Sequence, residues 1–290
     1  MREFDKIENN PRVIDIIKFA LQEDGANNDV TSLSLVNPAI TVTASILARH
    51  KCRVAGCSVG EKIFHQVDNS LKVDVVVKDG DDINADDVLL RVRGSALSIL
   101  SAERTVLNFM QRMTGIATST KMFVDAVAGT KCKILDTRKT SPGLRVLDKY
   151  SVKAGGGTNH RHGLHDMVLI KDNHRKLWSR ENSSRLDLAV LEARKKFPSL
   201  PIEVEVETLE ELQNALSANP DWIMLDNMSP EKMKEAVSIT AGRCKLEASG
   251  GINIDTIHAV AKSGVDAISL GCLTHSVKAA DLSLEIDMIG

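Results

Sequence analysis

Short runs of apolar and β-branched residues recur through the second half of the chain, starting about 20 to 35 residues apart. Helix-like stretches lie between several of these runs, and two of the stretches carry helix start signals. Thr208 and Glu211 form a capping box, and Ser229 precedes a first-turn proline, Pro230. This rhythm predicts parallel strand–helix units. The predicted strands are residues 134–137, 167–171, 202–206, 222–226, 245–249 and 267–271.

Nearly every predicted strand ends on a polar residue or a glycine that packing alone does not require; Lys171, Asp226 and Gly271 are examples. Parallel strands with intervening helices can close into a barrel, and the carboxyl ends of barrel strands lie at the face where active sites are assembled. We therefore expect an α/β barrel over residues 113–274, with its chemistry at the carboxyl ends of the strands.

The first part of the chain combines helix-like and strand-like segments without this regular repeat. We expect a separate α/β domain over residues 1–112, with the apolar C-terminal tail, residues 275–290, packing back on it. The predicted helices of this domain are residues 12–22, 58–67 and 96–113, and its predicted strands are residues 41–48, 72–78 and 87–93.

Composition narrows the class of protein. The 290 residues are 43% hydrophobic, so the chain can bury a sizeable core, and its length fits about two domains. The N-terminal residues contain no apolar run, and no stretch approaches the roughly 18 apolar residues of a membrane span, so we expect a cytoplasmic protein with no membrane partner. The five cysteines are never spaced as Cys-x-x-Cys, which disfavours a disulfide framework or a zinc ribbon.

Positive charge is concentrated in one segment. Residues 131–176 contain eleven Lys or Arg against four acidic residues, whereas the whole chain has a net charge of −2. Apolar runs within the segment indicate that it is folded, so its cations are held in place, which suits a small polyanion. Aromatic residues make up only 3% of the chain and leave few platforms for nucleic-acid bases, so no nucleic-acid partner is expected.

Two features of the basic segment suggest anion binding. Arg138 and Lys139 directly follow a predicted strand, where a guanidinium can grip a carboxylate or phosphate with two hydrogen bonds, although a solvated surface pair explains them equally well. Three consecutive glycines, residues 155–157, predict a tight loop that brings His160 and Arg161 near a ligand.

Charged residues also occupy the predicted strands themselves. Lys171 is the last residue of an otherwise apolar predicted strand. Because burying an unpaired charge there would be costly, we expect the Lys171 side chain to contact a ligand. Glu203, Glu205 and Glu207 alternate with valines and therefore point to one face of their strand. If that face is the inside of the barrel, Glu205 and Asp226 form an acidic pair that suits magnesium together with substrate oxygens. The alternative is that these glutamates balance neighbouring lysines.

Small residues follow the last two predicted strands, Ser249-Gly250-Gly251 after one and Gly271 after the other. Barrels often bind phosphate at this position through backbone N–H groups and a helix N-terminus. These residues are therefore predicted to form a phosphate site.

Further motifs are spread over nearly the whole chain, at residues 23–25, 29–31, 103–108, 135–140, 159–161, 170–174, 203–206, 224–227 and 247–251. Together these motifs resemble those of the quinolinate phosphoribosyltransferase family. The resemblance implies an N-terminal α/β sandwich domain followed by an incomplete α/β barrel of the seven-stranded type. It also implies a homo-oligomer, a dimer or a hexamer, with shared active sites.

The resemblance also implies roles for single residues. Cations and one threonine would bind the two carboxylates of quinolinate, with Arg104 entering from the partner subunit. Glu205 and Asp226 would hold the ribose of phosphoribosyl pyrophosphate near its magnesium, which is expected to be held through the substrate with no firm protein ligand. Lys139, Lys171, Glu205 and Asp226 are the expected catalytic residues. The carboxylate-binding set is Arg104, Thr137, Arg138, Lys139, His160, Arg161 and Lys171, and the 5′-phosphate set is Ser249, Gly250, Gly251 and Gly271.

The implied reaction transfers the phosphoribosyl group to quinolinate with decarboxylation, giving nicotinate mononucleotide, pyrophosphate and carbon dioxide in NAD biosynthesis. One alternative is a related phosphoribosyltransferase that acts on nicotinate, whose single carboxylate needs fewer cations than the basic segment supplies. The other is a nucleic-acid-binding protein, which the scarce aromatic residues and the slightly negative net charge disfavour.

Overall fold

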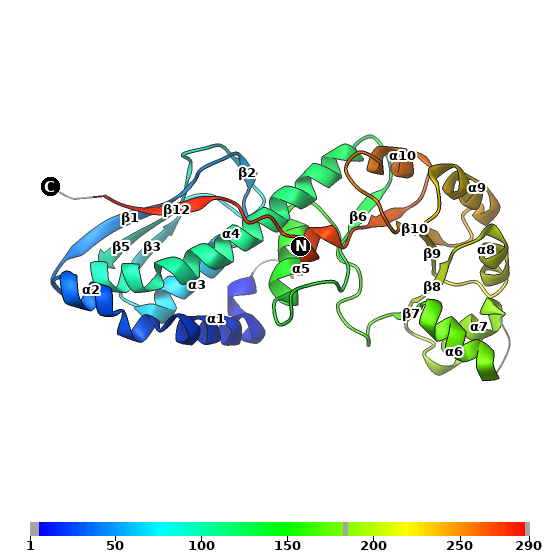
Figure 1. The fold of residues 1–290 in the computed structure, drawn as a ribbon, viewed down its shortest axis with the longest axis horizontal. Coiled ribbons are helices and arrows are strands. Elements are labelled where there is room, and N and C mark those ends of the chain that lie inside the picture. The colour runs from blue at the N-terminus through cyan, green and yellow to red at the C-terminus, as the bar shows by residue number, and fades with distance from the viewer. Residues whose placement is uncertain (1–5, 182–184, 288–290) are drawn as a thin grey trace. The chain divides into compact units, whose positions relative to one another are not determined.

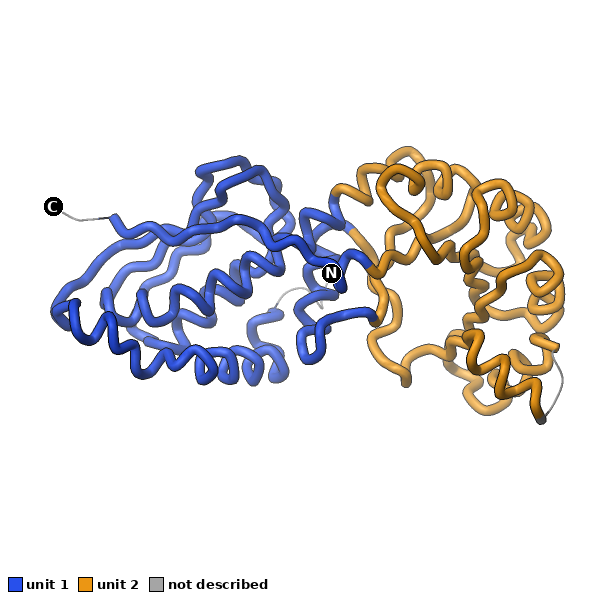
Figure 2. Tube along the Cα trace, viewed as in Figure 1, with its two compact units in different colours: residues 1–121, 139–156, 272–290 blue, residues 122–138, 157–271 orange. Residues whose placement is uncertain are grey.

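The computed structural model describes residues 6–181 and 185–287. Contacts between residues divide the chain into two compact units, shown in different colours in Figure 2. Unit 1 comprises residues 1–121, 139–156 and 272–290, and unit 2 comprises residues 122–138 and 157–271. This division differs from the expected one between residues 112 and 113, a boundary that stays a prediction.

Unit 1 is built on a four-stranded antiparallel sheet in the order β12-β1-β5-β3. The C-terminal strand β12 pairs with β1, so the tail of the chain completes the sheet of the first domain. A separate two-stranded ladder joins β2 to β4. The strands are β1 (Thr41–Ala48), β2 (Cys52–Arg53), β3 (Lys72–Val75), β4 (Asp82–Ile83), β5 (Val88–Ser95) and β12 (Leu282–Asp287).

Helices α1, α3 and α4 lie on one face of this sheet (Figure 1) and bury their apolar sides in the core of unit 1. Side-chain acceptors satisfy backbone N–H groups at the starts of α1 and α3. The Asn10 side chain accepts from the N–H of Arg12, and the two carboxylate oxygens of Asp79 accept from the N–H groups of Gly56 and Cys57. The helices of unit 1 are η1 (Ile7–Asn9), α1 (Pro11–Asp24), η2 (Ala26–Asn28), α2 (Val30–Leu35), α3 (Cys57–Val67), α5 (Arg145–Ala154), α11 (Cys272–His275) and most of α4 (Ala96–Ala126), whose last residues, from 122, belong to unit 2.

The long helix α4 does not end near Met113, as the sequence suggested, but continues to Ala126. Gly115 lies within this helix at a close approach of two backbones. A Cβ atom at Gly115 would lie 2.2 Å from the carbonyl oxygen of Lys278. The glycine is therefore needed for packing and does not terminate the helix.

Unit 2 contains six parallel strands in the order β6-β11-β10-β9-β8-β7. An isolated parallel bridge between Leu135 and Thr158 adds a further rung beside β6. The strands are β6 (Lys133–Leu135), β7 (Val168–Ile170), β8 (Ile202–Val206), β9 (Trp222–Asp226), β10 (Lys245–Ser249) and β11 (Ala267–Ser269). The predictions for 202–206, 222–226 and 245–249 are confirmed to the residue.

Helices connect these strands, and Figure 1 shows α8, α9 and α10 on the outer side of the strands. Both predicted start signals are present: Thr208 Oγ1 accepts from the N–H of Glu211, and Ser229 Oγ accepts from the N–H of Lys232. The arrangement confirms the predicted fold class, an α/β domain followed by an incomplete α/β barrel. The helices of unit 2 are α6 (Asp172–Glu181), α7 (Leu186–Lys196), α8 (Leu209–Leu216), α9 (Pro230–Thr240) and α10 (Ile257–Lys262).

None of the helices in the described part of the chain is long and apolar enough to cross a bilayer.

Candidate functional site

The sheet register of unit 2 aligns several predicted site residues on one face. Glu205 pairs with Met224, which also pairs with Glu247, and Asp226 pairs with Ser249. Paired residues of neighbouring parallel strands point to the same face, as do alternate residues of one strand. Glu205, Asp226 and Ser249 therefore share a face, and they lie at or near the carboxyl ends of their strands.

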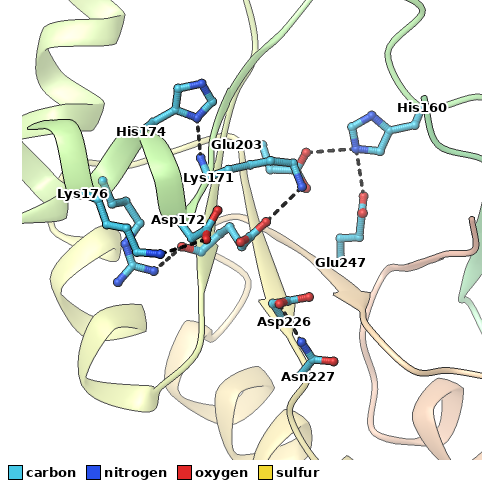
Figure 3. Close-up of polar contacts among 11 residues, drawn as sticks. His160, Lys171, Asp172, His174, Lys176, Glu203, Asp226, Asn227 and Glu247 are labelled. Carbon is cyan, nitrogen blue, oxygen red and sulfur yellow. Dashed lines mark hydrogen bonds and ion pairs between the residues drawn. The ribbon is translucent and has the colours of Figure 1, made fainter. Parts of the chain in front are cut away.

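An ion pair marks this face. Lys171, which directly follows β7, donates from Nζ to Oε2 of Glu205 at 3.1 Å (Figure 3). Both groups affect the pKa of the neighbouring Asp226. Burial and the charge of Glu205 raise this pKa, and the positive charge of Lys171 lowers it in part. The structure thus brings together the three predicted catalytic residues of unit 2, with Lys171 paired to Glu205 and Asp226 within their electrostatic influence.

The two predicted arginines of unit 2 are also neighbours. Burial and the nearby Arg138 guanidinium lower the pKa of Arg161, and Arg161 donates from Nη1 to the carbonyl oxygen of Met167 at 3.1 Å. Two guanidinium groups whose charges disfavour each other are stabilised when an anion binds to them.

His160 lies deeper in unit 2, between two acidic side chains. Its Nε2 is 3.0 Å from Glu203 Oε2 and 3.3 Å from Glu247 Oε2, as Figure 3 shows. Burial acts to lower the pKa of His160, but the contacts with the two glutamates outweigh it and raise the pKa to about 10. Burial and the charge of Glu247 raise the pKa of Glu203 to about 7.

A third buried carboxylate organises the loop that carries His160. Asp136, with no exposed surface, follows β6 and accepts from the backbone N–H of His160 at 2.9 Å and from the side chain of Asn159. Thr137 and Arg138 come next along the chain. Asp136 therefore ties the residue 159–161 loop to the carboxyl end of β6.

Glycine lets two other strand ends approach closely. The backbone N–H of Asn227, after β9, donates to the carbonyl oxygen of Ser249 at 2.9 Å. Gly250 has a φ of +92°, and a Cβ atom there would lie 2.2 Å from Asn227 Oδ1. Gly251 has a φ of +63°, but a Cβ atom added to Gly251 would have no atom within 4 Å. Gly271 follows the last strand, β11.

Two predicted residues belong to unit 1. Arg104 is exposed on α4, and Lys139 is exposed with its carbonyl oxygen accepting from Thr274 Oγ1 at 2.9 Å. Their contribution to the site stays a prediction.

Four supporting residues were not among the predicted ones. Besides Asp136, Glu203 and Glu247, they include Arg175 on α6, which donates from Nη1 to the carbonyl oxygen of Glu205 at 3.2 Å and pairs with Glu211. Strand alternation was the available signal for the two glutamates, because Glu203 and Glu247 each lie two positions from a predicted residue. Their shared partner, His160, could not be read from that pattern.

A cavity of about 580 Å³ opens in unit 2 at the other ends of the strands. Residues at or near the amino ends of the strands line it, including Lys133, Trp222 and Lys245, and it reaches the layer of His160 and Glu247. Among its described lining residues there is no member of the Lys171, Glu205 and Asp226 cluster. Two of the predicted substrate-binding residues, His160 and Arg161, do line this cavity.

Family profiles, related sequences and solved structures all relate this chain to one family of proteins. The family profile "Quinolinate phosphoribosyl transferase, C-terminal domain" matches residues 116–285, and the corresponding N-terminal domain profile matches residues 29–114. The rice protein named nicotinate-nucleotide pyrophosphorylase [carboxylating], chloroplastic, is 44% identical, over 94% of this chain and 77% of its own length.

A Bacillus subtilis protein named probable nicotinate-nucleotide pyrophosphorylase [carboxylating] is 40% identical, over 92% of this chain and 90% of its own length. The solved structure of the nicotinate-nucleotide pyrophosphorylase from Francisella tularensis superposes with a TM-score of 0.90 at 39% identity, covering 98% of this chain and 99% of that one. The chain therefore belongs to the quinolinate phosphoribosyltransferase family.

Proposed function

We propose that the chain transfers the phosphoribosyl group of phosphoribosyl pyrophosphate to quinolinate and releases carbon dioxide, giving nicotinate mononucleotide and pyrophosphate. The observation that carries the proposal is the meeting of Lys171 with Glu205 beside Asp226, at the carboxyl ends of parallel strands. That position is where barrel enzymes assemble their active sites. The relatives' names, which include both pyrophosphorylase and carboxylating activity, support the same reaction.

Substrate binding follows from the charges. Arg138 and Arg161, with Lys139, Lys171, Thr137 and His160, are proposed to bind the two carboxylates of quinolinate. The phosphate of the sugar is proposed to bind at Ser249, Gly250, Gly251 and Gly271, where backbone N–H groups are available without side-chain obstruction. Glu205 and Asp226 are proposed to hold the ribose hydroxyls.

In the transfer step the pyridine nitrogen attacks the anomeric carbon while the bond from that carbon to the pyrophosphate oxygen breaks. Positive charge develops at the anomeric carbon, and the carboxylates of Glu205 and Asp226 stabilise it. Lys171 and Lys139 balance the charge of the reacting anions. The product of this step is a quaternary pyridinium that still carries both carboxylates.

Decarboxylation then uses the positive ring nitrogen. The bond between the ring and the adjacent carboxylate breaks, carbon dioxide departs, and the electron pair stays on the ring carbon until that carbon takes a proton. The pyridinium stabilises this carbanion, so no side chain has to remove a proton. Arg138, Arg161 and Lys171 are proposed to fix the ring and to exclude water.

Magnesium fits the acidic side of the cluster. Burial and the charge of Glu205 raise the pKa of Asp226, so a cation nearby would relieve the repulsion between the two carboxylates. We propose that the ion is held through the oxygens of phosphoribosyl pyrophosphate, near Glu205 and Asp226. When bound, it would neutralise charge on the pyrophosphate leaving group.

The proposed assembly is a homodimer or hexamer in which Arg104 enters the active site of the partner subunit. The cytoplasm remains the proposed location, although the rice relative is named as chloroplastic.

Substrate choice tests the function. The purified chain with magnesium and phosphoribosyl pyrophosphate should convert quinolinate to nicotinate mononucleotide, and nicotinate should give little or no product under the same conditions. Product formed from nicotinate but not from quinolinate would identify the related phosphoribosyltransferase instead.

A further inference from the structure

The imidazole of His160 has polar contacts at both ring nitrogens. Its Nε2 faces Glu203 and Glu247, and its Nδ1 lies 2.7 Å from the backbone nitrogen of Arg161, which donates to it. A ring nitrogen that accepts an N–H carries a lone pair and no proton. These contacts correspond to the tautomer with its proton on Nε2.

The cluster can hold its protons in two ways, and the contact at Nδ1 distinguishes them. Because the pKa values of His160 and Glu203 are both raised, the cluster of His160, Glu203 and Glu247 keeps more protons near neutral pH than one neutral imidazole and two carboxylates would. One such additional proton gives either an imidazolium beside two carboxylates or a neutral imidazole with one glutamate protonated. Only the second arrangement leaves Nδ1 free to accept the N–H of Arg161; the first would bring two donors together.

The glutamates also have oxygen atoms that can carry this additional proton. Within the described part of the chain, the buried atoms Glu203 Oε1 and Glu247 Oε1 have no hydrogen-bond partner. Two ionised carboxylates in this environment would carry an uncompensated buried charge, and a shared proton reduces it.

This arrangement restrains the backbone of Arg161. Asp136 fixes the backbone of His160 from one side, and the imidazole holds the Arg161 N–H from the other. The Arg161 side chain leaves this restrained backbone close to Arg138 and bonds the Met167 carbonyl. Its direction therefore depends on a correctly oriented His160 ring.

Resting on the proposed function, we propose that Glu203 and Glu247 are positioning residues for substrate binding. They hold His160 as the Nε2–H tautomer, so that its Nδ1 fixes the backbone of Arg161 and aims the guanidinium at a carboxylate of the pyridine substrate.

Nuclear magnetic resonance tests the tautomer without any substrate. In protein labelled with ¹⁵N-histidine, the His160 signals are identified by their loss in His160→Gln among the eight histidines of the chain. We expect one protonated and one unprotonated ring nitrogen near neutral pH. Two protonated nitrogens would identify an imidazolium and overturn the proposal. This result is independent of whether the chain makes nicotinate mononucleotide.

Kinetics tests the positioning role. Glu203→Gln and Glu247→Gln keep the side-chain shape but alter which atoms donate to His160, and each is expected to raise the KM for quinolinate about tenfold, the loss typical of one charge-assisted hydrogen bond. The KM for phosphoribosyl pyrophosphate should change much less. Glu235→Gln, an exposed charge-matched change on α9, is the control and should alter neither KM.

Unchanged quinolinate KM values in both folded glutamine variants would refute the positioning role. A stoichiometric transition-metal ion in the purified protein that is lost in Glu247→Gln would also refute it, because the three side chains would then be metal ligands. If wild-type protein gave the expected tautomer but no product from quinolinate, the proposed function would fail while the tautomer assignment stood.

Discussion

Glu203 and Glu205 are two positions apart on the same strand, yet their surroundings give them different chemistry. Glu203 is fully buried against His160 and Glu247, and its pKa is raised to about 7. Glu205 pairs with Lys171, whose side chain is 44% exposed. Strand alternation in the sequence predicted that both would share a face. It could not predict their partners, because these come from loops about 30 to 45 residues away along the chain.

At the residue scale, the two glycines after β10 provide a matched pair for testing the proposed phosphate site. Gly250→Ala should raise the KM for phosphoribosyl pyrophosphate at least tenfold, because its Cβ would meet Asn227 and displace the backbone N–H groups. Gly251→Ala has free space and should cost only the left-handed backbone strain, about 1 to 2 kcal/mol of stability. Steady-state kinetics with thermal unfolding separates the two effects. Equal KM changes in both variants would contradict a role for the close approach at Gly250.

At the element scale, the strands that pattern alone located best were β8, β9 and β10. Each is a short apolar or alternating run next to a helix with a strong capping signal or a glycine turn. The predicted end of α4 near Met113 was wrong. The helix continues past Gly115, which packs against Lys278, a residue more than 160 positions away that no local pattern could indicate.

Helices α4 and α5 of unit 1 are joined by a buried ion pair that the sequence pattern did not indicate. Arg112 donates from Nε and Nη2 to both carboxylate oxygens of Asp148, at 2.9 Å each, and Asp148 is fully buried. Burial raises the pKa of Asp148, and Arg112 opposes this effect.

Removing one partner of this pair should be strongly destabilising. Arg112→Ala leaves the Asp148 carboxylate buried without its cation and should lower the free energy of unfolding of unit 1 by about 3 to 5 kcal/mol. Chemical denaturation measures the change. Lys196→Ala, which breaks the exposed pair with Glu192, is the control and should cost at most about 1 kcal/mol. A similar small loss in both variants would mean that Asp148 is readily solvated or neutralised.

At the scale of the whole molecule, the C-terminal strand belongs to the domain that is formed mainly by the first part of the chain. Strand β12 completes the sheet of unit 1 after the chain has formed all of unit 2. The motifs that carried the family resemblance come from both units, which is why recognition from sequence and the comparisons agree over nearly the whole length. The arrangement of subunits is not contained in a single chain, and it stays a proposal.

Subunit mixing tests that proposal. Arg104→Ala and Lys171→Ala should each be nearly inactive alone, but if Arg104 acts in the partner's site, a mixed dimer contains one site with both residues intact. Random exchange should then restore roughly a quarter of wild-type activity. Each variant mixed with itself is the control. No recovery, despite exchange verified by mass spectrometry, would contradict the shared site.

The most direct measurement of the central claim is the product ratio with quinolinate labelled in the departing carboxylate. We predict one carbon dioxide released for each nicotinate mononucleotide formed by the wild-type chain. Both products should fall together, by about a hundredfold or more, in Lys171→Ala. Nicotinate mononucleotide without labelled carbon dioxide, or full activity in Lys171→Ala, would contradict the account.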